Sequence, residues 1–200
     1  MDSKTALLVI DMQNDFCEGG ALAVEGGTSI VPLVNKLIAG YDHVILTQDW
    51  HPQGHSSFAS QYEDKAPFET IEMPYGEQVL WPDHCLQGTD GAAFHRELEW
   101  TTAQLVIRKG FRREIDSYSA FRENDRETPT GLAGYLRERG IDDLVLCGLA
   151  FDYCVAWSAL DARRFGFSAR VVEEATAAID LDGSKAKMRL AMEEAGVRFA

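Results

Sequence analysis

One cysteine of this chain stands where a catalytic nucleophile would be expected. Cys154 follows a short apolar run and lies in the first turn of a helix predicted over Asp152–Phe165. At that position the helix dipole and the free backbone N–H groups favour a thiolate and can bind an oxyanion. A lone cysteine is more often a small buried apolar residue, an interpretation that suits Cys147, Cys17 and Cys85 better. Cys154 is therefore the candidate nucleophile.

A carboxylate and a lysine follow two other apolar runs. Asp11 follows the run Ala6–Ile10, and the run Leu105–Ile107 stops at Arg108 and Lys109. Each could have an ordinary role, Asp11 as a turn cap and Lys109 as a surface cation. A carboxylate after a buried strand, however, is costly to desolvate without a partner. Beside a thiol, Asp11 could take the thiol proton and return it to a leaving group, while Lys109 holds the charges together.

Asp49 and His51 form a pair suited to a metal ion. They are two positions apart in an extended segment, so their side chains point the same way. A carboxylate and an imidazole can chelate one divalent ion, and a third ligand would complete a catalytic site with open positions. His84 is the leading third ligand, with His55 and Ser57 as the alternatives. The competing interpretation is a capping aspartate beside an exposed histidine.

Two aromatic residues lie close in sequence to these polar groups. Phe16 follows Asp11, and Trp81 precedes His84. Both could be plain core residues. In a pocket, their faces could hold a flat ring between them.

Strands and helices alternate along the chain, and they must position these residues. We expect strands over Ala6–Ile10, His43–Thr47, Leu105–Ile107, Leu144–Cys147, Ala169–Val172 and Val197–Phe199, and helices over Gly27–Ala39, Pro129–Arg139, Asp152–Phe165 and Ser184–Ala195. This alternation predicts an α/β fold, an open parallel sheet with helices on both faces. Ligands of such sheets bind beyond the carboxyl ends of the strands. Asp11, Asp49, Lys109 and Cys154 would meet there.

The chain has 200 residues, enough for one domain and short for two. We therefore expect a single domain over residues 1–200. The stretch from about residue 51 to residue 100 breaks the alternation and is rich in Pro, Gly, His and aromatic residues. A segment of this length without a clear period often shapes a site.

Composition narrows the classes of partner. A protein with a net charge of −13 would be repelled by nucleic acid and by anionic membranes, so neither is an expected partner. The four cysteines form no C-x-x-C pair, and the N-terminus lacks the pattern of a signal peptide. No apolar run approaches the roughly 18 residues of a spanning helix. We expect a soluble, cytoplasmic protein with reduced thiols and a small-molecule substrate.

From Leu7 to roughly Val172 the chain resembles the nicotinamidase family of the isochorismatase-like hydrolases. The segments that carry the resemblance are Val9–Phe16, Thr47–Pro52, His55–Ala59, Trp81–Cys85, Arg108–Gly110 and Gly148–Val155. The resemblance implies an isochorismatase-like hydrolase fold with the catalytic residues Asp11, Lys109 and Cys154. It also implies one divalent ion on Asp49, His51 and His84, with zinc as the first choice and iron or manganese as alternatives. His55 and Ser57 remain alternatives as outer ligands.

The resemblance further implies the substrate contacts. They would come from Phe16, Trp81, Tyr118 and Leu149, and a cis peptide between Leu149 and Ala150 would aim the Ala150 N–H at the oxyanion, beside the N–H of Cys154. The implied reaction is hydrolysis of nicotinamide to nicotinate and ammonia through a cysteine thioester, with the metal binding the pyridine ring. A role in NAD salvage and acceptance of pyrazinamide are implied as well.

Three points stay open at the level of sequence. An amidase for carbamoyl or ureido substrates would share the catalytic residues, although the Asp49, His51 and His84 set argues against it. A non-catalytic domain used for protein assembly would not need those catalytic residues at all. Self-association is common in the superfamily, so a homo-oligomer is a further expectation.

Overall fold

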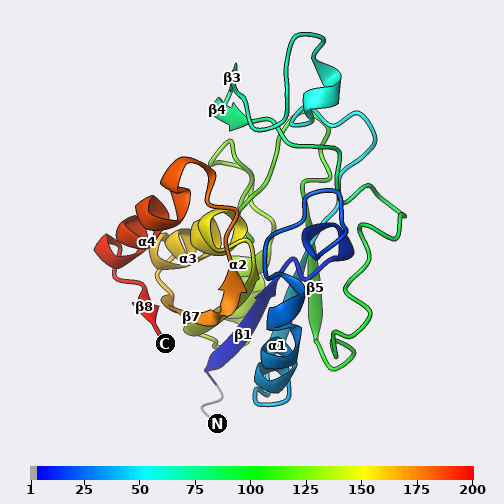
Figure 1. Cartoon of the computed structure of the whole chain (residues 1–200). Coiled ribbons are helices and arrows are strands. Elements are labelled where there is room, and N and C mark those ends of the chain that lie inside the picture. Colours follow the sequence, from blue (N-terminus) through cyan, green and yellow to red (C-terminus); the bar gives the residue numbers. More distant parts are fainter. Residues whose placement is uncertain (1–3) are drawn as a thin grey trace.

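Six strands form one parallel sheet in the computed structural model, which describes residues 4–200 (Figure 1). In spatial order they are β5 (Leu105–Lys109), β2 (Val44–Asp49), β1 (Thr5–Ile10), β6 (Asp143–Leu149), β7 (Ser168–Ala177) and β8 (Arg198–Phe199). Every neighbouring pair is parallel. The predicted open parallel sheet is therefore confirmed.

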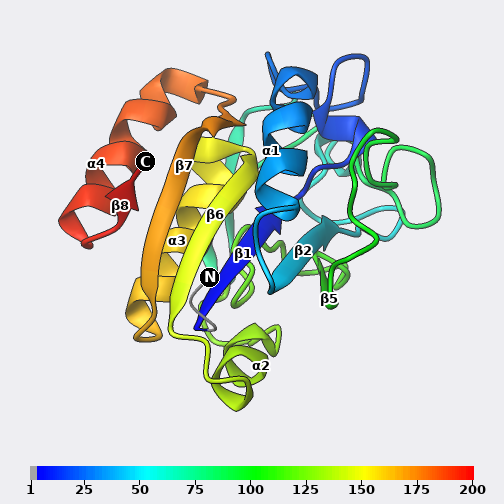
Figure 2. The same cartoon turned by 90° about the horizontal axis from the view of Figure 1, so that it is seen from below.

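Helices cover both faces of this sheet (Figures 1 and 2). They are α1 (Val31–Ile38), α2 (Leu132–Glu138), α3 (Ala156–Arg164) and α4 (Ser184–Glu194). Leu7 and Val9 of β1 pack in one core cluster with α1, whereas Leu8 packs in a second cluster with α2, α3 and α4. Because β1 is buried on both sides, it is a continuous apolar run without alternation.

Three predicted helices have clearly different bounds in the structure. The helix predicted over Pro129–Arg139 begins only at Leu132, because Gly131 before it has a left-handed φ of +99°. The helix predicted over Gly27–Ala39 begins at Val31, because residues Thr28–Ile30 form a 3₁₀ turn ahead of it. The helix predicted over Asp152–Phe165 is divided into a π-helical turn, Phe151–Val155, and α3. Sequence periodicity does not distinguish these tighter and wider turns from an α-helix, because pieces of three and five residues are too short to show a period.

The segment 51–100 lies over the carboxyl ends of the sheet strands (Figure 1). It contains a two-stranded antiparallel hairpin that we did not predict, β3 (Thr70–Met73) and β4 (Gly76–Val79). The residues of β3 alternate between exposed and half-buried, so the strand has no apolar face that a pattern could reveal. The insertion is thus a cover for the edge of the sheet where we expect the site.

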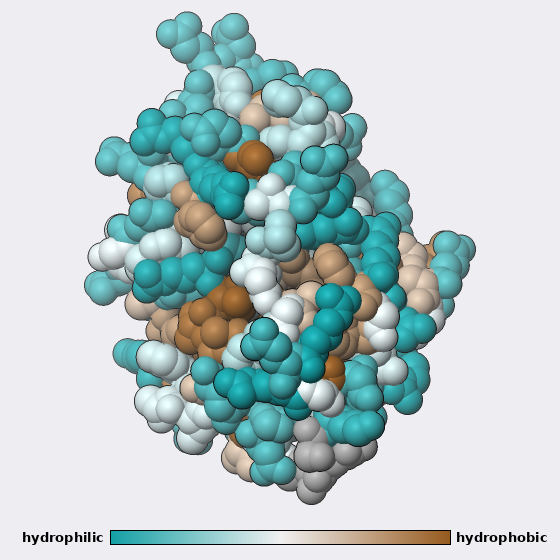
Figure 3. All heavy atoms as spheres, turned by 180° about the vertical axis from the view of Figure 1, so that it is seen from behind, coloured by the Kyte–Doolittle hydropathy of each residue, from teal (hydrophilic) through white to brown (hydrophobic). Residues whose placement is uncertain are grey.

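The face seen from behind is largely hydrophilic (Figure 3). Seen from behind, hydrophobic residues gather at mid-height and hydrophilic residues surround them (Figure 3). Among residues 4–200, no helix combines the length and apolar character needed to span a membrane.

Candidate active site

Three side chains that are distant in sequence meet at the carboxyl ends of β1, β5 and β6. The Nζ atom of Lys109 lies 2.8 Å from Oδ2 of Asp11 and 3.4 Å from Sγ of Cys154. Lys109 is only 1% exposed and Cys154 only 7% exposed, so water screens these contacts little. The structure therefore brings together the carboxylate, ammonium and thiol expected from the sequence.

The two carboxylate oxygens of Asp11 have different surroundings. Oδ1 accepts a hydrogen bond from the hydroxyl of Thr47 at 2.6 Å, and that hydroxyl accepts one from the Asp11 N–H at 3.1 Å. Oδ2 is close to Lys109 but accepts no well-aligned hydrogen bond from it. Since Thr47 fixes one oxygen, the other is the one available to a proton from the thiol.

Burial and neighbouring charges set the protonation states of these groups. Burial raises the pKa of the Cys154 thiol well above its usual value; Lys109 opposes this effect, and Asp11 and Asp49 add to it. Burial raises the pKa of Asp11 too, again against Lys109. For Lys109, burial disfavours the charged form, but Asp11 and Asp49 outweigh it and raise the pKa well above normal. Lys109 is therefore a permanent cation, and the thiol keeps its proton until a base removes it.

Backbone geometry places Cys154 at the end of β6. The peptide bond between Leu149 and Ala150 is cis, as the resemblance implied. The Val155 N–H donates to the Ala150 carbonyl at 3.1 Å, which closes the π-helical turn around Cys154. Gly148 has φ of +110°, and a Cβ atom there would lie 2.1 Å from the Ile10 carbonyl oxygen. Only glycine therefore allows β6 to pass this close to β1.

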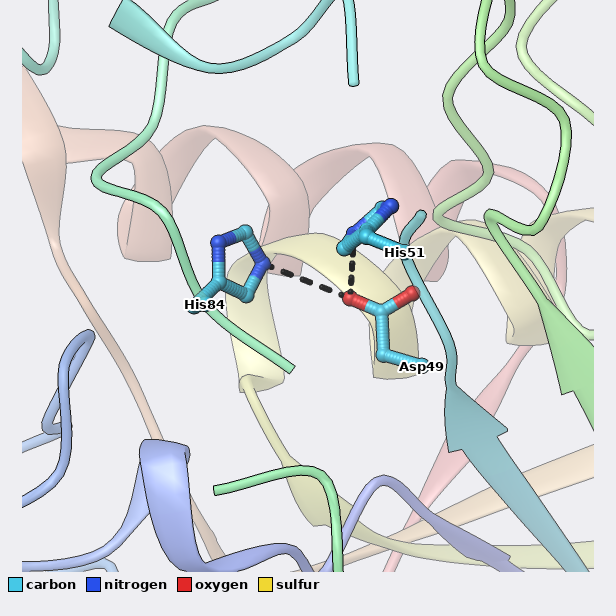
Figure 4. A group of neighbouring side chains, drawn as sticks. All are labelled: Asp49, His51 and His84. Atoms are coloured by element: carbon cyan, nitrogen blue, oxygen red, sulfur yellow. Dashed lines mark hydrogen bonds and ion pairs between the residues drawn. The ribbon is translucent and has the colours of Figure 1, made fainter. Parts of the chain in front are cut away.

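The proposed metal ligands also converge (Figure 4). Oδ2 of Asp49 lies 3.0 Å from Nε2 of His51 and 3.4 Å from Nε2 of His84. The Nδ1 atoms contact the carbonyls of Gly110 at 2.9 Å and Pro82 at 2.7 Å. A carbonyl can only accept, so each Nδ1 carries the proton and each Nε2 is turned toward the carboxylate. Two imidazoles oriented by backbone carbonyls beside a carboxylate fit a divalent cation.

The electrostatics of this group agree with a bound cation. Burial disfavours the charged form of Asp49, but His51 and Lys109 hold the pKa of this carboxyl well below its usual range. Burial also opposes a charge on His51, yet Asp49 raises the pKa of His51. A proton and a metal ion would therefore compete for the His51 nitrogen that faces Asp49.

Gly110 fits closely against the metal ligands. Its φ is +66°, and a Cβ atom there would lie 2.5 Å from Cε1 of His51 and 2.9 Å from Oδ1 of Asp49. Any side chain would displace these groups, so the glycine after Lys109 is required by close packing.

His55 and Ser57 lie beside this group and contact each other. His55 Nδ1 is 2.8 Å from the Ser57 hydroxyl. His55 also forms a second possible ligand cluster with His51 and Asp116. Asp116 was assigned no role of its own from the sequence, because the loop around it has no periodic pattern. Its place two residues before Tyr118, an expected substrate contact, was the signal that could have marked it as a site residue.

A pocket of about 320 Å³ connects the two groups of polar residues. Its lining consists of Phe16, Leu22, Asp49, Trp81, His84, Asp116, Tyr118, Ala150, Tyr153, Cys154 and Ile179. The Trp81 and Tyr153 rings pack edge to face with centroids 4.8 Å apart. Leu149, expected to touch substrate, is fully buried in the core cluster of α1. The sequence analysis missed Tyr153, Leu22 and Ile179, whose apolar or aromatic types are equally typical of a core.

Comparisons with known proteins agree with this geometry. The isochorismatase domain family matches residues 5–198. A nicotinamidase of Acinetobacter baylyi is 56% identical over 182 residues, which cover 91% of this chain and 85% of the relative. The solved structure of an Acinetobacter baumanii nicotinamidase and pyrazinamidase is 53% identical, with a TM-score of 0.98 over 100% of this chain and 96% of that chain.

Two further solved structures contain ligands. A protein from L. infantum in complex with nicotinate is 37% identical, with a TM-score of 0.87, over 100% of this chain and 94% of that one. A pyrazinamidase from Pyrococcus horikoshii in complex with zinc is 32% identical, with a TM-score of 0.81, over 98% of both chains. From the match over nearly its whole length, together with these similarities, this chain belongs to the isochorismatase family of hydrolases.

Proposed function

We propose that this protein is a nicotinamidase, which hydrolyses nicotinamide to nicotinate and ammonia. The observation that carries the proposal is the contact of Lys109 with both Asp11 and Cys154 at a pocket that Asp49 and His84 also line. The similarity to nicotinamidases and to a nicotinate complex supports this choice of substrate.

Cys154 attacks the carboxamide carbon once its proton has moved to Asp11. Lys109, 3.4 Å from the sulfur, balances the negative charge that develops there. The tetrahedral intermediate breaks its carbon–nitrogen bond, and ammonia leaves with the proton from Asp11. A water molecule then gives a proton to Asp11 and attacks the thioester, which releases nicotinate and restores the thiol.

Backbone N–H groups of Ala150 and Cys154 stabilise the oxyanion in this mechanism, each contributing about 3–4 kcal/mol. Phe16 and Trp81 hold the pyridine ring. The part of the pocket that Asp49 and His84 line receives the ring nitrogen.

Asp49, His51 and His84 would hold one divalent ion, and zinc suits their nitrogen and oxygen atoms best, with iron and manganese as alternatives. A bound ion supplies a Lewis acid that binds the pyridine nitrogen and orients the carboxamide. The zinc complex of the Pyrococcus horikoshii pyrazinamidase supports the proposed metal. His55 and Ser57 are proposed to lie in its outer shell.

The same similarities support a second substrate and a metabolic role. We infer that the protein also accepts pyrazinamide, the substrate that the names of two of these relatives indicate, and that it contributes to NAD salvage. All four cysteines are free in the described part of the chain. The cytoplasmic location stays a prediction. Self-association stays a prediction for gel filtration with light scattering.

The decisive experiment compares Cys154→Ala with Cys147→Ala. Cys147 is fully buried within β6, so its replacement is a matched control that leaves the pocket intact. Ammonia release from nicotinamide should vanish in Cys154→Ala and persist in Cys147→Ala, while both keep about one metal ion per chain by elemental analysis. Near-normal turnover by Cys154→Ala would refute the mechanism, and preference for carbamoyl substrates would refute the choice of substrate.

A further inference from the structure

A buried amide in the β3–β4 hairpin contacts residues on two sides of the pocket. Gln78 is 1% exposed and is the one fully buried residue in the two strands of this hairpin. An amide without hydrogen-bond partners would be costly at such a position. Its partners therefore show which groups this side chain holds in place.

Donors and acceptors fix the orientation of this amide. Oε1 of Gln78 accepts hydrogen bonds from Tyr75 Oη at 3.2 Å and from Asn124 Nδ2 at 3.1 Å. At the other end, Nε2 lies 2.7 Å from the Val79 carbonyl and 2.9 Å from Oδ2 of Asp116. Since a carbonyl and a carboxylate accept hydrogen bonds, the nitrogen must occupy this end.

The bond to Asp116 reaches toward the metal ligands. Oδ1 of Asp116 accepts a hydrogen bond from the Ser117 N–H at 2.7 Å and lies 3.9 Å from Nε2 of His51. Gln78 holds the other oxygen of this carboxylate, so both oxygens are fixed. The amide thereby orients a carboxylate that lines the pocket next to His51.

A second bond reaches the aromatic wall. Nε2 of Gln78 also lies 2.9 Å from Oη of Tyr118, so its two protons serve three acceptors and at least one of these bonds is shared. The indole N–H of Trp81 donates to the same Tyr118 oxygen at 3.2 Å. Asn124, held by Gln78, accepts a hydrogen bond from the Tyr118 N–H at 3.1 Å. Both rings line the pocket and pack edge to face. The position of the Trp81 indole therefore depends on Gln78 through the Tyr118 hydroxyl.

We propose that Gln78 is a positioning residue that sets the affinity of the pocket for the flat ring of the substrate. This inference rests on the proposed function, in which Trp81 holds the pyridine ring. Gln78 does not line the pocket itself and acts through Tyr118 and Asp116. It controls ring binding, whereas the chemistry at Cys154 depends on Asp11 and Lys109.

The kinetic test replaces Gln78 with methionine, which has similar length and no hydrogen-bonding group. Gln78→Met should raise KM for nicotinamide at least about tenfold, the equivalent of one hydrogen bond of about 1.4 kcal/mol, with kcat within about threefold. Glu77→Gln is the matched control, because Glu77 is an exposed neighbour on the same strand, and its KM should not change. An unchanged KM in a folded Gln78→Met would overturn the proposal.

A double-mutant cycle tests the route through Tyr118. In a Tyr118→Phe background the oxygen shared by Gln78 and Trp81 is gone, so Gln78→Met should raise KM by less than about threefold. Full additivity of the two effects would overturn that route. If Gln78→Met does not fold, Gln78→Leu carries the same test, because it also removes the amide and places no second carboxyl beside Asp116.

A spectroscopic measurement separates this proposal from the proposed function. In ¹H–¹⁵N spectra, the Trp81 indole peak, assigned with Trp81→Phe, should move in Gln78→Met while the Trp100 peak stays in place. This readout needs no turnover, so a wild-type protein that releases no ammonia would refute the function and leave the positioning test intact. A Trp81 peak that does not move would refute the positioning role.

Discussion

Lys109→Met removes the only lysine of the site and leaves two buried carboxylates without their shared partner. Nζ of Lys109 lies 2.8 Å from Asp11 and 3.1 Å from Asp49, and it donates to the Ser117 carbonyl at 3.0 Å. Methionine fills most of the same volume, so the loss is electrostatic. Removing one partner of a buried ion pair costs about 3–5 kcal/mol, because the other charge stays buried and uncompensated. We expect a loss of this size in the free energy of unfolding.

Urea denaturation in the presence of a chelator measures this loss with the protein's own charges alone. In a thermal melt, about 3–5 kcal/mol corresponds to a fall in Tm of roughly 6–20 °C for a chain of this size. Lys65→Met is the control, since the Lys65–Glu69 pair is partly exposed and should contribute at most about 1 kcal/mol. If Lys109→Met has the same free energy of unfolding as Lys65→Met, Asp11 and Asp49 are not charged partners of Lys109, and the predicted loss of stability is refuted.

The loss of stability in Lys109→Met should change with pH in a definite direction. In the wild type, the pKa of Asp49 is held well below normal, so its stabilisation is complete above its unfolded pKa of about 3.9 and is lost as the pH falls below it. Without Lys109, burial is opposed only by Thr47 at Asp11 and by His51 and His84 at Asp49, so the pKa of both carboxyls should rise. A buried carboxyl with a raised pKa destabilises the folded protein while it is charged. The difference in free energy of unfolding between the wild type and Lys109→Met should therefore shrink as the pH falls from 8 to 5. A difference that grows over this range would contradict the assignment.

Three further substitutions test the remaining parts of the site. Asp11→Asn should lower turnover by about 10²–10⁴-fold because an amide cannot take the thiol proton, and a loss below about tenfold in steady-state assays would remove Asp11 as the proton carrier. Gly110→Ala should release the metal, since its Cβ would lie 2.5 Å from His51, and elemental analysis showing full metal content would contradict this. His84→Ala should weaken metal affinity in a competition titration with a chelator, whereas unchanged affinity would point to His55 as the third ligand.

The sheet and the catalytic residues were accessible from sequence for a physical reason. Strands buried on both faces are continuous apolar runs, and their carboxyl ends share one edge of a parallel sheet. Asp11, Lys109 and Cys154 each follow such a run, so their meeting could be predicted without knowing any contact between them. The ligands Asp49 and His51 follow a fourth run in the same way.

Other parts of the site depend on packing that no local pattern records. The one buried residue of the hairpin strands is the polar Gln78, so β4 carries no apolar signal. Asp116 and Tyr153 belong to the pocket only because the loop before α2 and the turn before α3 come together there. Long-range placement of this kind leaves no period in the sequence, and only the folded chain shows it.

The catalytic group and the metal group are electrostatically one unit. Asp49 is a proposed ligand in one group and an ion-pair partner of Lys109 in the other, and Lys109 contacts Asp11 and Cys154. Because these groups are buried, water screens their charges little. A change of charge at Asp49 therefore alters the electrostatic energy of Asp11 and Cys154 on the other side of Lys109. A cation at Asp49 would compete with Lys109 for that carboxylate, which frees more of the ammonium charge for Asp11 and the sulfur. If Asp49 binds a metal ion as proposed, its ion pair with Lys109 would couple metal binding to the charge at the Cys154 thiol.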